Sequence, residues 1–155
     1  MKYLLLVLLG VLLSGPVLPA LAHEGHAKDP FHQHRLVQGT EVALQLMSVR
    51  AYRQYLAARK LPAPAFSAPY VLLVVLAHDK RWLDTRVKLK ITDAEGQSVG
   101  AASGLEPVKV SEKTGPHYAF PVALQKQQNY LVMVQFAGRN GLQRAGFEIK
   151  QLPAS

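Results

Sequence analysis

Alternating apolar and polar residues dominate the chain from about residue 39 onward, as in β-strands with one buried face. In TRVKLKIT (85–92), Val87, Leu89 and Ile91 alternate with cations. The stretch YVLLVVLAH (70–78) is almost wholly apolar, which favours a strand buried on both faces. The pattern predicts strands at 39–49, 70–78, 85–92, 105–110, 117–124, 129–136 and 142–152.

Two stretches interrupt this β pattern. RAYRQYLAARK (50–60) places Tyr52, Tyr55 and Leu56 at helical spacing, and the proline-rich LPAPAFSAP (61–69) predicts a loop. DAEGQ (93–97) and GRNG (138–141) are turn signals between neighbouring strands. We therefore predict an all-β fold: an antiparallel, immunoglobulin-like β-sandwich of about seven strands with one short helical or irregular insertion.

The first 22 residues have a different pattern, typical of a secretory signal peptide. Lys2 precedes an apolar run from Tyr3 to Leu13, helix-breaking residues follow, and Ala20-Leu21-Ala22 fits a cleavage site. An uncleaved anchor is the alternative, although the run is short for a membrane span. We expect a signal peptide at 1–22, a flexible His-rich tail at 23–37 and a β-sandwich domain at 38–152, in a soluble protein exported to the periplasm.

Composition narrows the partners that we expect. The chain has 18 Lys and Arg residues against 10 Asp and Glu, a net charge of +8. In an exported protein this charge points away from nucleic acid and toward a membrane transporter, an acidic periplasmic protein or anionic lipid. The basic stretch from Arg50 to Lys60 is the candidate surface for such docking, and a basic surface that only maintains solubility is the simpler interpretation.

Histidines cluster directly after the expected cleavage site, in HEGHAKDPFHQH (23–34). Four of the six histidines lie here: His23, His26, His32 and His34. Cleavage after Ala22 would let the α-amine and ring of His23 chelate one metal ion. Because the chain has no cysteine and few methionines, an imidazole site suits Cu(II) best, with Zn(II) or Ni(II) also possible. The alternative is a solvated tail that binds no metal.

We find no arrangement of residues that predicts catalysis. The serines lie in no nucleophile-elbow context, and no glycine-rich phosphate loop is present. No carboxylate pair lies in an apolar setting suited to acid–base chemistry. We therefore expect a protein that is not an enzyme.

The second half of the chain resembles small periplasmic, immunoglobulin-like β-sandwich proteins associated with copper and iron uptake. The resemblance covers roughly residues 70–150 and is carried by VKLKITDAEGQSVG, LEPVKVSEKTGPHYAF and NYLVMVQF. Its most distinctive motif is G-P-H-Y at 115–118. The resemblance implies a metal-binding carrier, buffer or transporter accessory of the same fold.

The resemblance also implies a copper site, of which this chain has only part. In the family, the histidine of G-P-H-Y binds copper with a methionine about seven residues upstream, a glutamate on an early strand and another histidine. The histidine of G-P-H-Y corresponds to His117 in this chain, but Val110 occupies the position of the upstream methionine. His78 is a candidate for the second histidine. This gap favours the competing hypothesis, a non-catalytic interaction module whose basic surface docks on an acidic partner or membrane.

Overall fold

The computed structural model describes residues 30–101, 103–113 and 115–154. Within these described residues, nine strands and one helix follow in the order β1 (His32–Val37), β2 (Thr40–Ser48), α1 (Val49–Ala58), β3 (Tyr70–His78), β4 (Arg81–Trp82), β5 (Val87–Asp93), β6 (Val108–Glu112), β7 (Gly115–Val122), β8 (Tyr130–Gly138) and β9 (Gly141–Ile149). The expected signal peptide and residues 23–29 of the tail, with His23 and His26, lie outside the described residues.

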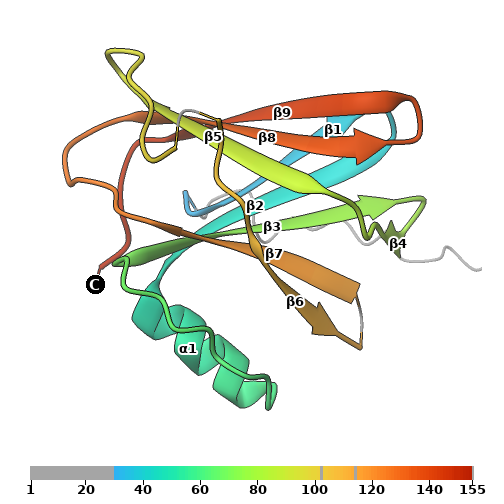
Figure 1. Cartoon of the computed structure of the whole chain (residues 1–155), viewed down its shortest axis with the longest axis horizontal. Coiled ribbons are helices and arrows are strands. Elements are labelled where there is room, and N and C mark those ends of the chain that lie inside the picture. Colours follow the sequence, from blue (N-terminus) through green and yellow to red (C-terminus); the bar gives the residue numbers. More distant parts are fainter. Residues whose placement is uncertain (1–29, 102, 114, 155) are drawn as a thin grey trace, which may run out of the picture.

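The strands form two antiparallel sheets that face each other (Figure 1). Sheet A has the order β1-β2-β3-β7-β6, with β4 paired to the end of β3, and sheet B has the order β5-β8-β9. Inward-facing residues of both sheets, such as Leu72, Phe120 and Phe136, fill the space between them. The prediction of an antiparallel β-sandwich is confirmed, and each of the seven predicted strands overlaps an observed one. The insertion, predicted as helical or irregular, contains the helix α1.

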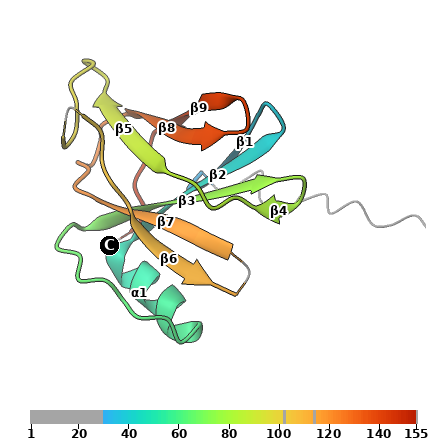
Figure 2. The ribbon, with the colours of Figure 1, turned by 45° about the vertical axis from the view of Figure 1, so that its right-hand side comes forward.

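Helix α1 lies against the outer face of sheet A and forms a second, smaller core there (Figure 2). The hydroxyl of Ser48 caps the helix by accepting a hydrogen bond from the Ala51 amide. Tyr52 and Leu56 are buried against Val71 and Leu73, which are outward-facing residues of β3. The Arg50–Lys60 stretch is therefore mostly a helix that attaches to the sandwich through its apolar face.

The sandwich begins earlier than predicted, because residues His32 to Val37, expected in the tail, form β1 and pair with β2. Gln38 and Gly39 both have positive φ, as a two-residue hairpin turn requires. The inward-facing positions of β1 include the polar Gln33 and Arg35, so the apolar alternation of a strand is missing. The Gln33 amide donates to the Glu148 carbonyl, and Arg35 lies over the Phe147 ring.

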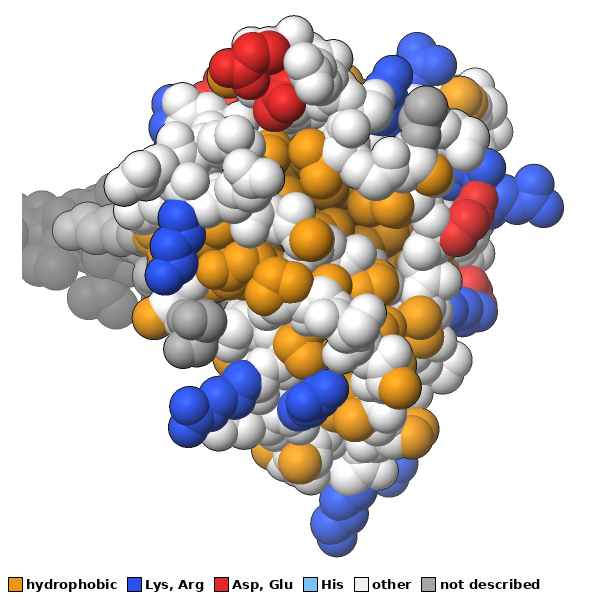
Figure 3. All heavy atoms as spheres, turned by 60° about the vertical axis from the view of Figure 1, so that its left-hand side comes forward, with side chains coloured by type: hydrophobic (Ala, Val, Ile, Leu, Met, Phe, Trp, Pro, Cys, Tyr) orange, Lys and Arg blue, Asp and Glu red, His pale blue; other side chains and the backbone are white. Residues whose placement is uncertain are grey.

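The surface of the molecule is uneven in its polarity. Figure 3 shows hydrophobic side chains reaching the surface in a broad band on one face, with acidic side chains at its upper border and at its right-hand edge. Among the described residues, no helix is long and apolar enough to cross a membrane.

Candidate functional site

The histidine of the G-P-H-Y motif is buried under α1. In β7, Tyr118 and Phe120 face the space between the sheets, whereas His117 faces outward, beneath the helix, and is only 3% exposed. Its partner in the strand register is Val110 of β6. The residue at the family's methionine position is thus beside His117 but has an aliphatic side chain, which is also buried.

Both ring nitrogens of His117 contact protein groups. Nδ1 lies 2.7 Å from Oε1 of Glu112, and Nε2 lies 2.8 Å from the hydroxyl of Tyr52. Because an ionised carboxylate only accepts, Nδ1 carries the proton and Nε2 accepts from the Tyr52 hydroxyl. Tyr55 donates a second hydrogen bond to Glu112, and Arg59 lies 3.5 Å from the other carboxylate oxygen.

The surroundings of this cluster favour neutral rings and phenols. Burial lowers the pKa of His117 from its ordinary value, although the hydrogen bond to Glu112 acts in the opposite direction. Burial, with Tyr55 and Glu112 nearby, raises the pKa of Tyr52. Burial and the hydrogen bond to Glu112 raise the pKa of Tyr55 to about 12. Neither phenol is therefore an anionic ligand near neutral pH.

The His117 cluster does not fit a resident copper ion. A metal would have to displace Tyr52 or Glu112 from a ring nitrogen and would find Val110 where the family has a thioether. The described contacts instead join α1, β6 and β7. His117 and its neighbours Tyr52, Glu112 and Tyr55 thus form a structural polar network within the small core.

The glycine of G-P-H-Y is required by a packing contact. Gly115 has a φ of 130°, and a Cβ added to it would collide with the side chain of Trp82 from β4. At the other end of the motif, the Tyr118 hydroxyl accepts from the Thr85 amide and donates to Asp84. The motif therefore has a structural explanation that needs no metal.

A second pair of candidate ligands lies on β1, the edge strand of sheet A. His32 and His34 are two residues apart and so share one face of the strand, with ring centroids 4.5 Å apart. Nδ1 of His34 lies 2.9 Å from Oε1 of Glu41 on β2. A carboxylate at one imidazole nitrogen is the arrangement that orients a metal-binding histidine through its other nitrogen.

The remaining candidate histidines are not brought together with this pair. The strand register places His34 and His117 on the outer face of the same sheet but three strands apart, about 14 Å at the usual strand spacing. His78 ends β3, where its ring contacts Thr40 and Asp79. Within the part of the chain that the structure describes, no three His, Asp or Glu side chains form a group that could hold a metal ion.

Several residues of these clusters carry no signal in the sequence that marks them as site residues. Tyr52 and Tyr55 indicate only an amphipathic helix, and nothing in the sequence links them to His117, which lies 65 residues after Tyr52. Glu112 is across a tight hairpin from His117, and that proximity is the one available signal. Glu41 is an exposed residue of β2, and the one feature that points to it is its position on the strand that pairs with β1.

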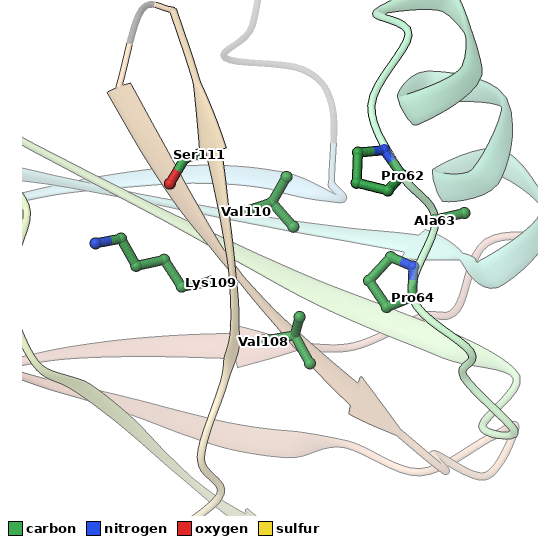
Figure 4. A pocket seen from close by; sticks show the side chains of 7 residues that line it. All are labelled: Pro62, Ala63, Pro64, Val108, Lys109, Val110 and Ser111. Atoms are coloured by element: carbon green, nitrogen blue, oxygen red, sulfur yellow. The ribbon is translucent and has the colours of Figure 1, made fainter.

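A groove of about 380 Å³ lies between β6 and the connection that follows α1. Val108 and Val110 point toward Pro62 and Pro64, whereas Lys109 points away (Figure 4). The lining of the groove has no histidine or carboxylate. The Nζ atom of Lys109 is paired with Oδ2 of Asp84 at 2.6 Å. The groove therefore offers apolar contacts and no ligands for a metal ion.

Comparison with known proteins places the chain by its fold. No protein-family model matches it, and no curated protein matches it in sequence. A solved structure of a DUF4426 family protein from Pseudomonas aeruginosa is similar with a TM-score of 0.62 and 15% identity, over 81% of this chain and 98% of that one. At such identity the likeness shows the fold alone.

Two structures of FetP from uropathogenic Escherichia coli strain F11 are also similar. A copper-bound variant has a TM-score of 0.53 and 13% identity, over 80% of this chain and 97% of that one. The protein as isolated has a TM-score of 0.53 and 11% identity, over 79% and 95%. The resemblance to β-sandwich proteins associated with copper, stated from the sequence, is thus confirmed at the level of the fold.

Proposed function

We propose that this chain is an exported, periplasmic protein that binds copper without catalysing a reaction, and that His32 and His34 on β1 carry the metal. The observation that supports the proposal is the pair itself: two imidazoles on one face of an edge strand, 4.5 Å apart, with Glu41 at Nδ1 of His34. Imidazole suits Cu(II), which binds more tightly to such ligands than Zn(II) or Ni(II).

The His32–His34 pair supplies two ligands, and the segment before it supplies the remainder in this proposal. His23 and His26 are close in sequence, and cleavage after Ala22 would add the α-amine of His23. In that arrangement Glu41 holds the ring of His34 rather than binding the metal. A site that is completed by a terminal segment suits a carrier, buffer or transporter accessory, because its copper can be exchanged without unfolding the sandwich.

Copper titration by calorimetry tests this proposal. The chain from His23 to Ser155 should bind Cu(II) with a Kd of about 1 μM or tighter. The double variant His32→Asn, His34→Asn should lose at least tenfold in affinity, and His78→Asn is the matched histidine control that should not. Equal affinity of the double variant for Cu(II) would reject the site. If a residue added before His23 weakens Cu(II) binding, the α-amine of His23 takes part in the site.

A further inference from the structure

The two sheets differ in what covers their outer faces. Helix α1 covers part of the outer face of sheet A, whereas no described element lies over the outer face of sheet B in either view (Figures 1 and 2). We call this uncovered surface, formed by the outward-facing residues of β5, β8 and β9, the sheet B face. Its composition is not that of an ordinary solvated face.

One side of the sheet B face is a ladder of cations. Arg86, directly before β5, and Lys88 and Lys90 within it alternate with residues that are buried between the sheets. They therefore point outward at intervals of about 7 Å. Across the sheet, Lys88 is opposite Gln135 and Gln135 is opposite Arg144, so a fourth cation lies on the far strand, about 10 Å away.

The strand between these cations is uncharged. Its outward side chains are Leu131, Met133, Gln135 and Ala137, and Leu131 is 46% exposed. Gly146 is the register partner of Met133. The methyl group of Met133 lies 3.8 Å from the position that a Cβ on Gly146 would occupy, so Met133 lies over the space that the glycine leaves open. Leu142, 63% exposed, extends the apolar strip at the β9 end.

Most of these cations form no ion pair with a described acidic residue. Lys88 pairs with Glu106, and Glu148 pairs with Lys150, but Arg86, Lys90 and Arg144 have no ion pair with a described residue. The Arg50–Lys60 stretch uses part of its charge internally. Arg59 contacts Glu112 and Tyr55, and Arg53 donates to the Phe66 carbonyl.

We infer that the sheet B face is a docking surface for an acidic protein. Carboxylates of the partner would oppose Arg86, Lys90 and Arg144, and its apolar side chains would contact Leu131 and Met133. Arginine and methionine are enriched in the centres of protein interfaces. A lipid surface is a poorer match, because membrane-associated surfaces favour aromatic side chains at the headgroup level, and the exposed Trp82 lies on β4 of sheet A instead.

Binding to poly-L-glutamate, observed by ¹⁵N–¹H NMR at low salt, tests the inference. The matched pair of variants removes three exposed cations each: Arg86→Gln, Lys90→Gln, Arg144→Gln on the sheet B face, and Arg50→Gln, Lys60→Gln, Arg81→Gln elsewhere. Amide shifts should gather in β5, β8 and β9. The first variant should weaken binding about tenfold and the second less than about twofold, since charges that meet the partner directly matter more than net charge.

Two outcomes would overturn this inference. Equal weakening by both triple variants would mean that net charge alone binds the polymer. Binding to phosphatidylglycerol vesicles that is lost only in the first variant, without localised shifts from poly-L-glutamate, would assign the face to lipid. Neither outcome depends on copper, so the result is independent of the function proposed above.

Discussion

The hydroxyl of Tyr52 in α1 lies 2.8 Å from Nε2 of His117 in β7, and both residues are buried. This contact joins the helix to sheet A through the histidine that the sequence resemblance assigned to copper. We therefore expect that removing the His117 side chain lowers the free energy of unfolding and leaves the affinity for copper unchanged.

Replacing His117 by alanine should lower the free energy of unfolding by about 2–4 kcal/mol, because Glu112 and Tyr52 would be left buried without their partner. Tyr52→Phe, which removes only one hydroxyl, should cost about 1 kcal/mol. Urea unfolding measures both. A loss of copper affinity in His117→Ala protein that is still folded would contradict this assignment.

The stability contributed by His117 should depend on pH. Burial lowers its pKa in the folded protein, although Glu112 counteracts this effect. The unfolded chain therefore binds the proton more readily, so this contribution is complete above the ordinary pKa of about 6.5 and is lost as pH falls through the lower folded value. Between about pH 7.5 and about pH 5.5, wild-type protein should lose more unfolding free energy than His117→Gln. Parallel losses would show that another group titrates.

Gly115→Ala should destabilise the protein by about 2–3 kcal/mol, since the added Cβ meets Trp82 and φ is positive. Gly96→Ala is the matched control, because its φ is also positive but its Cβ would meet nothing within 4 Å. It should cost about 1 kcal/mol. In a Trp82→Ala background, the cost of Gly115→Ala should fall toward that of the control; an unchanged cost would rule out the Trp82 contact as its cause.

Most of the fold could be predicted from the sequence, because a strand with one buried face shows a regular alternation of apolar and polar residues. The alternation in 85–92 led directly to β5, and the helical spacing of Tyr52, Tyr55 and Leu56 led to α1. Strand β1 was missed because Gln33 and Arg35 occupy inward-facing positions, where long polar side chains contact β9 rather than fill the core.

The sites were less predictable, because contacts between distant segments leave little local pattern. His117, Val110 and the G-P-H-Y motif could be located from the sequence, but the Tyr52 contact that occupies the ring could not. His32 and His34 were expected in a flexible tail with His23 and His26. Their pairing on a strand face depends on the β1–β2 hairpin, for which the histidine-rich sequence gave no apolar signal.

Paramagnetic broadening by Cu(II) shows whether His32 and His34 carry the metal, because it locates the ion in the folded protein. We would add substoichiometric Cu(II) to ¹⁵N-labelled chain from His23 to Ser155 and record which amide signals disappear first. We expect losses in β1 and the facing part of β2, around His32, His34 and Glu41, while the signals of β6 and β7 around His117 remain. Early loss of the β6 and β7 signals, with β1 intact, would contradict this placement of the metal.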